Sequence, residues 1–116
     1  KHIDQAEFDR PHGHRTLPVL LGDRAARTVN RLIVAGMYLI VALLIAAGRL
    51  TPSAAIVALA LPRGLRALAV MGRPRPAGPP AGYVGWPLWY HRVCLVHNRL
   101  FGWLYLAGLA LAVVLT

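Results

Sequence analysis

All four acidic residues of this 116-residue chain, Asp4, Glu7, Asp9 and Asp23, lie within its first 23 positions. Basic residues flank them, so the same segment offers carboxylates for a divalent cation and guanidinium groups for phosphate oxygens. Mg²⁺ prefers oxygen ligands and is held by one or two carboxylates together with substrate phosphates. Arginine pairs bidentately with phosphate oxygens. The segment therefore indicates either a Mg²⁺-dependent site for a phosphorylated substrate or a solvated run of charges beside a helix.

The rest of the chain is too apolar for an ordinary soluble domain. Hydrophobic residues make up 57% of the sequence, charged residues make up 15%, and the mean hydropathy is +0.52. Soluble domains average about 25% charged residues. The formal net charge of +9 could suggest a nucleic-acid partner, but the arginines cluster at the ends of apolar runs, as they do in membrane proteins. We therefore expect an integral membrane protein that contacts membrane lipids and binds no nucleic acid.

Three apolar segments predict three membrane-spanning helices, so the expected fold class is an all-α, polytopic transmembrane bundle. The first segment holds 17 uncharged residues, which as a helix reach about 26 Å. Pro62 predicts a kink in the second. The expected organisation is a polar Asp-rich loop at 1–28, spans at 29–49, 52–72 and 97–116, and a Pro/Gly-rich loop at 73–91. Small residues that could allow close helix packing are Gly36, Gly102, Ala107 and Gly108.

The basic residues predict the orientation of these spans. If the opening segment faces the cytoplasm, the Pro/Gly-rich loop lies on the same side. Of the 13 Lys and Arg residues, only Arg49 then lies on the opposite side. This distribution satisfies the positive-inside rule, so we expect a cytoplasmic Asp-rich loop in a bacterial inner membrane.

The segment from Asp4 to Gly22 reads D-x-x-x-x-D-x-x-x-G-x-R-T-L-P-V-x-L-G. It resembles the second aspartate-rich motif of the UbiA-type intramembrane prenyltransferases. The three apolar segments after it, and the sequence "HNRLFG" at 97–102, are similar to the C-terminal helices of that family. The chain begins without Met and inside a polar segment, so we expect it to be the C-terminal part of a longer enzyme and inactive alone.

The resemblance implies a nine-helix all-α bundle in which two aspartate-rich motifs hold Mg²⁺ and the diphosphate of an allylic prenyl donor. The first motif lies outside this chain. The implied acceptor is an aromatic or lipid molecule, most commonly an aromatic quinone precursor. The implied roles are metal-binding catalytic residues Asp9 and Asp4, diphosphate contacts Arg15, Arg10 and Lys1, and a supporting residue Glu7.

The spacing of the acidic pair departs from the family, whose paired aspartates stand four residues apart. That place holds Gln5 here, and Asp4 is one residue earlier. On an ideal helix Asp4 lies about 140° from Asp9, whereas Gln5 lies about 40° away. Two interpretations stay open: Gln5 gives the metal a neutral oxygen, or a local distortion brings Asp4 to it.

Other interpretations compete with this one. A non-catalytic three-span membrane subunit, whose acidic segment binds lipid headgroups or a partner protein, has the same composition. A second aspartate-rich motif upstream would distinguish the enzyme from the subunit. A CDP-alcohol phosphotransferase would need a tighter arrangement of aspartates, which the sequence lacks. We expect His2, His12 and His14 to be polar loop residues, and Arg63 and Arg66 to anchor their helix at the membrane interface.

Overall fold

The computed structural model describes residues 1–115, and Thr116, the end of the third expected span, lies outside the described residues. Every regular element in the described part is helical, and the elements are α1 (His2–Asp9), α2 (Leu17–Leu21), α3 (Asp23–Ala46), the 3₁₀ helix η1 (Pro52–Ala60), α4 (Leu61–Met71) and α5 (Trp89–Leu115). Three helical segments are long and apolar enough to cross a membrane: α3, the continuous η1–α4 segment, and α5. The prediction of an all-α chain with three candidate spans is confirmed.

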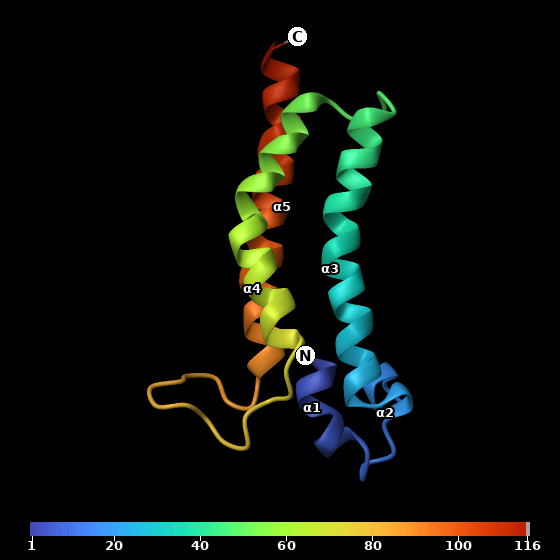
Figure 1. Ribbon diagram of the computed structural model, residues 1–116, viewed down its shortest axis with the longest axis vertical. Helices are drawn as coiled ribbons and strands as arrows, with labels where there is room; N and C mark the ends of the chain where they lie inside the picture. The colour runs from blue at the N-terminus through green and yellow to red at the C-terminus, as the bar shows by residue number, and fades with distance from the viewer. Residues whose placement is uncertain (116) are drawn as a thin grey trace.

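The three long segments run side by side along the long axis of the molecule, which measures 54 × 32 × 21 Å (Figure 1). The short helices α1 and α2 lie at one end, together with the Pro/Gly-rich loop between α4 and α5. The C-terminal end of α5 and the turn between α3 and η1 lie at the other end. The acidic segment and the Pro/Gly-rich loop, which are far apart in the sequence, therefore meet at the same end of the bundle.

Two of the long helices begin earlier than their apolar runs. Helix α3 starts at Asp23, because residues 23–28 continue the helix with Ala26 and Arg27 buried against its neighbours. Helix α5 starts at Trp89 rather than near residue 97. The expected polar loop at 1–28 contains α1, α2 and this first part of α3.

The middle segment changes helix type along its length. Its first half, η1, is a nine-residue 3₁₀ helix, which is longer than most 3₁₀ helices. Its second half is the α-helix α4, and Pro62 is the second residue of that helix. A proline has no N–H to donate, and near the first turn of an α-helix that loss costs little. Pro62 therefore lies where the hydrogen-bonding pattern changes.

Small residues bring η1 close to α5. A Cβ added at Gly108 would lie 2.8 Å from the Cα of Ala54 and 2.8 Å from the carbonyl oxygen of Ser53. The hydroxyl of Ser53 donates a hydrogen bond of 2.7 Å to the carbonyl of Gly108. The prediction of close packing at Gly108 is confirmed, whereas a Cβ at Gly36 or Gly102 would meet nothing within 4 Å.

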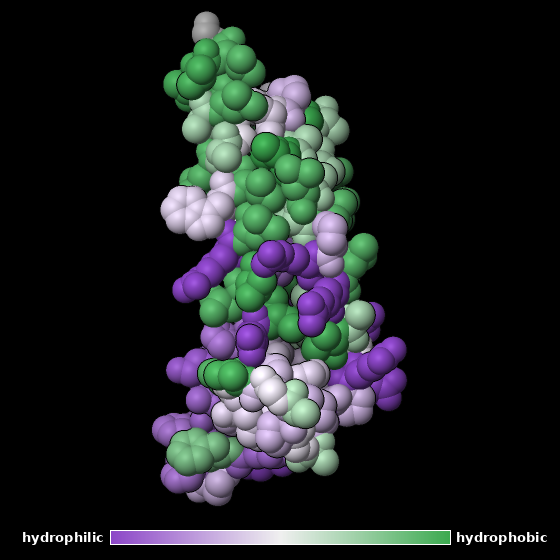
Figure 2. All heavy atoms as spheres, turned by 90° about the vertical axis from the view of Figure 1, so that its left-hand side faces the viewer, coloured by the Kyte–Doolittle hydropathy of each residue, from purple (hydrophilic) through white to green (hydrophobic). Residues whose placement is uncertain are grey.

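The outer faces of the long helices carry exposed apolar side chains. Six of the largest that are more than half exposed are Leu32, Ile33, Leu39, Leu59, Leu65 and Trp103. Apolar residues dominate the half of the molecule distant from α1 and α2 (Figure 2). An apolar surface of this extent is unfavourable in water and favourable against lipid acyl chains. The fold is therefore compatible with a multi-pass integral membrane protein in contact with lipid.

Candidate functional site

The sequence-predicted site residues all lie at one end of the bundle, on α1 and on the loop that joins it to α2 (Figure 1). Helix α1 contacts α2, α3 and α5. Because it is covered on more than one side, Asp4 and Asp9 are both buried although they are five residues apart. The structure therefore gives the two carboxylates different surroundings.

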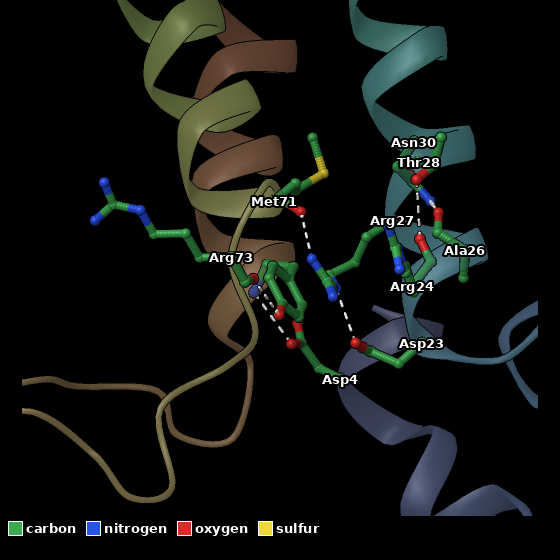
Figure 3. Close-up of polar contacts among 10 residues, drawn as sticks. Asp4, Asp23, Arg24, Ala26, Arg27, Thr28, Asn30, Met71 and Arg73 are labelled. Carbon is green, nitrogen blue, oxygen red and sulfur yellow. Dashed lines mark hydrogen bonds and ion pairs between the residues drawn. The ribbon is translucent and has the colours of Figure 1, made fainter.

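The carboxylate of Asp4 caps the N-terminus of α5. Its Oδ1 accepts a hydrogen bond of 3.1 Å from the backbone N–H of Tyr90, and its Oδ2 accepts one of 2.8 Å from the N–H of His91. Figure 3 shows Asp4 between α1 and the start of α5. The first N–H groups of a helix have no intrahelical acceptor and carry partial positive charge. Asp4 therefore satisfies two of these donors and fixes α1 against α5.

Arg75, in the Pro/Gly-rich loop, ties that loop to α1. Its Nη1 donates to the carbonyl oxygen of Asp4 at 3.0 Å, and its Nη2 lies 3.0 Å from Oε2 of Glu7. Its guanidinium also lies over the ring of Trp86, 5.3 Å from the centroid. The Glu7 side chain is 88% exposed, so this ion pair is worth little in free energy. Glu7 thus contacts the loop rather than Asp9.

Arg27 joins α3 to the end of α4. Its Nε donates to Oδ2 of Asp23 at 2.8 Å, and its Nη1 donates to the carbonyl of Met71 at 2.9 Å (Figure 3). Met71 is the last residue of α4, so its carbonyl oxygen receives no N–H donor from within that helix. The hydroxyl of Tyr90 donates to the carbonyl of Arg73, two residues after the end of α4, at 2.9 Å. These bonds hold the ends of three helices together.

Asp9 differs from the other three acidic residues. It is only 8% exposed, and no described residue donates a hydrogen bond to its carboxylate or forms an ion pair with it. The hydroxyl of Thr16, seven positions later, is enclosed and has no hydrogen-bond partner among the described residues, whereas the carboxylate oxygens of Asp9 are not fully enclosed. Asp9 is therefore the acidic group that is unpartnered and accessible to a cation.

The remaining predicted residues are distributed around this end of the bundle. Gln5 is half-buried, whereas Lys1, Arg10 and Arg15 are exposed. Arg10 lines a cavity of about 480 Å³ together with Glu7, Asp23 and Arg75. Lys1 lines a separate cavity of about 200 Å³ beside the start of α5, and Arg15 lines neither of the two. The structure thus brings Arg10 and Glu7 to one cavity and leaves Lys1 and Arg15 outside it.

The fit of a Mg²⁺ ion can be tested against these side chains. Residues 1–115 contain no group of three or more His, Cys, Asp or Glu side chains close enough to hold a metal ion together. Asp9 fits the role of a single carboxylate ligand, because it is buried and unpartnered. Both oxygens of Asp4 already accept hydrogen bonds. Any Mg²⁺ at Asp9 would need its other ligands from neutral oxygens such as a side-chain amide, from water, from phosphate or from residues outside the described range.

Three residues important to this end of the molecule, Arg27, Arg75 and Tyr90, did not emerge from the sequence. Arg75 and Tyr90 lie 71 and 86 positions from Asp4, so no local pattern could reveal their contacts. Arg27 carried a signal, since Asp23 stands four residues before it on the same helix, at the spacing of an intrahelical ion pair.

No protein-family model, no curated protein and no solved structure matches this chain. The resemblance to UbiA-type enzymes therefore depends on the motif between Asp4 and Gly22 and on the segments that follow it.

Proposed function

We propose that this chain is the C-terminal part of a nine-helix, Mg²⁺-dependent intramembrane prenyltransferase of the UbiA type. In this proposal the enzyme transfers a prenyl group from an allylic prenyl diphosphate to an acceptor, most commonly an aromatic quinone precursor. A bound Mg²⁺ would neutralise diphosphate charge as the allylic carbon–oxygen bond breaks. The roles of this chain are to hold one side of the metal–diphosphate site and to supply three of the membrane spans.

The observation that carries the proposal is the state of Asp9. Asp9 is 8% exposed as a residue, and its carboxylate oxygens accept no hydrogen bond and form no ion pair among the described residues. These oxygens are not among the fully enclosed atoms, so a negative charge without a protein partner remains open to a cation. In the motif, Asp9 is the aspartate whose register agrees with the family, so the burial and the resemblance support the same residue.

The structure bears on the open question of Asp4 and Gln5 by the partners that it gives them. Both oxygens of Asp4 accept backbone hydrogen bonds from α5, and its capping function is sufficient reason for its burial. Gln5 is half-buried with no side-chain hydrogen bond among the described residues. We therefore favour Gln5 as the neutral ligand beside Asp9. Asp4 would then act on the site by fixing α1 to α5.

Arg10 is the diphosphate contact that these surroundings favour. It lines the cavity that Arg75 also lines, so this cavity has basic residues from two segments in its wall. Two guanidinium groups could take up several phosphate oxygens bidentately. Lys1 and Arg15 remain predicted diphosphate contacts, and each is exposed.

The rival function is a non-catalytic three-span subunit whose acidic segment binds a partner or lipid headgroups. The contacts of Asp4 and Glu7 agree with this rival function, because both residues bond to other parts of the chain rather than to a metal site. Asp9 is the residue for which the two functions predict different behaviour.

The proposal is tested by donor binding to the full-length enzyme, since donor binding requires no knowledge of the acceptor. The probe is a non-hydrolysable farnesyl thiodiphosphate, titrated calorimetrically with Mg²⁺ and again with EDTA. We expect Mg²⁺-dependent binding that Asp9→Asn weakens at least about tenfold, because the isosteric amide removes the charge that the metal requires. Glu7→Gln, on the same helix, is the matched control and should stay within about threefold. Equal binding by Asp9→Asn and wild type would reject the metal site and leave the subunit interpretation.

The same titration distinguishes the two ligand assignments. If Gln5 is the ligand, Gln5→Leu raises the Mg²⁺ concentration needed for half-maximal binding, and Gln5→Asp lowers it. If Asp4 is the ligand, Asp4→Asn has the larger effect and Gln5→Leu is mild. If Gln5→Leu and Asp4→Asn both need the same Mg²⁺ concentration as wild type, neither side chain reaches the metal.

A further inference from the structure

A second cavity, of about 630 Å³, lies away from the acidic segment, between α4, α5 and the Pro/Gly-rich loop. Three arginines from two helices line it: Arg63 and Arg66 on α4, and Arg92 on α5. Tyr83 and Trp89 form part of its wall. Figure 2 faces this side of the molecule and shows hydrophilic side chains gathered between the apolar half of the bundle and the loop. The cavity is thus cationic, aromatic and placed at a boundary between polar and apolar surface.

The positive charge of this cavity has no counterpart in the described residues. None of the three arginines is within ion-pair distance of a carboxylate, since the two ion pairs present join Arg27 to Asp23 and Arg75 to Glu7. All four acidic residues of the chain lie before residue 24, on other elements. All three arginines are exposed, and an anion between them would offset the mutual repulsion that water screens only in part. The charge of the cavity therefore favours an anionic ligand.

One of the three guanidinium groups is held in place by the loop. Nη1 of Arg92 donates to the carbonyl of Val84 at 2.6 Å, and the guanidinium lies over the ring of Tyr83, 5.1 Å from its centroid. Tyr83 is itself fixed, because its hydroxyl donates to the carbonyl of Leu88 at 2.8 Å and its ring packs on Trp89. An arginine has five N–H donors, so Arg92 keeps several for a ligand. The loop therefore orients the Arg92 guanidinium and leaves it accessible from the cavity.

The remaining surface of the cavity is apolar and continues onto the outside of the bundle. Val70, Val93 and Val96 line it, and Leu65 and Leu95 are exposed on the same two helices. Arg66 lies five residues before the end of α4, about 7.5 Å along the helix axis. This depth, together with the aromatic side chains of Tyr83 and Trp89 in the cavity wall, matches the headgroup level of a bilayer. The ligand therefore has a charged head at the interface and an apolar part beside α4 and α5.

We propose that this cavity binds the headgroup phosphate of an anionic phospholipid, with the acyl chains against the apolar faces of α4 and α5. A zwitterionic headgroup is disfavoured, because its amine would lie among three guanidinium groups with no carboxylate to receive it. A soluble phosphate would leave the apolar walls without a partner. Basic pockets between membrane helices are recognised sites for acidic lipids. This inference does not depend on the proposed prenyl transfer.

Native mass spectrometry of the detergent-solubilised protein tests the proposal with defined lipids. The probes are a phosphatidylglycerol and a phosphatidylcholine with the same acyl chains, at equal concentration. We expect one phosphatidylglycerol to remain bound under conditions that remove phosphatidylcholine. The triple variant Arg63→Gln, Arg66→Gln, Arg92→Gln should reduce its occupancy at least about fivefold.

The matched control removes the same three charges elsewhere. Arg24, Arg49 and Arg99 are exposed and line no part of the cavity. The triple variant Arg24→Gln, Arg49→Gln, Arg99→Gln should therefore keep occupancy within about twofold of wild type. If the first triple variant loses its helical circular dichroism, Arg66→Gln alone is measured and should reduce occupancy about threefold.

Four results would overturn the proposal. They are equal lipid occupancy in the two triple variants, equal retention of the two lipids by wild type, displacement of the lipid by millimolar inorganic phosphate, and preferential displacement by a prenyl diphosphate. The third would show a site for free phosphate, and the fourth would show a site for the prenyl donor instead.

Discussion

The hydroxyl of Tyr38 on α3 lies 2.8 Å from Nε2 of His97 on α5, and so joins two of the candidate membrane spans. His97 is fully buried, and its Nδ1 lies 3.0 Å from Oδ1 of Asn98. An amide oxygen can only accept, so Nδ1 of His97 donates to Asn98, and Nε2 is left to pair with the Tyr38 hydroxyl. The imidazole therefore links α3 to α5 through a buried side chain.

Removing the Tyr38 hydroxyl should destabilise this bridge. We expect Tyr38→Phe to lower the free energy of unfolding by about 1 kcal/mol, because it leaves Nε2 of His97 buried without a partner. Tyr105→Phe is the control, since Tyr105 is half-buried on α5 and its hydroxyl has no hydrogen bond among the described residues. Unfolding in mixed micelles of increasing SDS fraction measures both variants. Equal stability of the two would show that the bond contributes nothing.

Gly108 should be the glycine least tolerant of a side chain. A methyl group there would lie 2.8 Å from backbone atoms of η1, which cannot rotate away as a side chain could. We expect Gly108→Ala to lower the free energy of unfolding by about 1–3 kcal/mol, the usual cost of overpacking. Gly102→Ala, on the same helix with open space around it, should be neutral or stabilising by up to about 1 kcal/mol. The same SDS titration compares them, and a smaller loss for Gly108 than for Gly102 would contradict the close approach.

The spans were predictable from the sequence because lipid imposes a local requirement on the chain. A run of about 20 apolar residues satisfies it without reference to any other segment. Gly108 was predictable for a similar reason, since small residues in an apolar run favour close packing. Gly64 was not, because it lies between two arginines in a stretch that reads as polar. A Cβ there would nevertheless lie 2.9 Å from the hydroxyl of Tyr38.

The site was less predictable because its contacts join distant parts of the chain. The sequence identified Asp4 as a chemically interesting carboxylate, but it could not show that α5 begins 85 positions later at Trp89, with N–H groups facing that carboxylate. The early start of α5 has the same cause, since a capped helix can begin before its apolar run. Local patterns thus pointed to the acidic residues at this end of the bundle, while long-range hydrogen bonds to residues such as Arg75 and Tyr90 determine their contacts.

The orientation in the membrane remains a prediction that labelling can test. In a Cys94→Ala background, a cysteine at Pro80 should react with an impermeant maleimide only when the cytoplasmic side is exposed. A cysteine at Arg49 should react only from the opposite side. Pro80 lies in the Pro/Gly-rich loop beside the acidic segment, and Arg49 lies in the turn at the other end of the bundle. Labelling of both positions from the same side would contradict a three-span arrangement.

Asp4 and Asp9 should respond in opposite directions to neutralisation. Asp4→Ala removes the acceptor of two N–H groups at the start of α5, so we expect the free energy of unfolding to fall by about 1–2 kcal/mol. Asp9→Asn removes a charge that has no partner among the described residues and only partial contact with solvent, so stability measured in EDTA should rise by up to about 1 kcal/mol. Glu7→Ala, at an exposed ion pair on the same helix, should change stability by less than about 0.5 kcal/mol. A loss for Asp9→Asn as large as that for Asp4→Ala would mean that Asp9 stabilises the fold. The opposite signs would separate the carboxylate that builds the end of the bundle from the one left free for a cation.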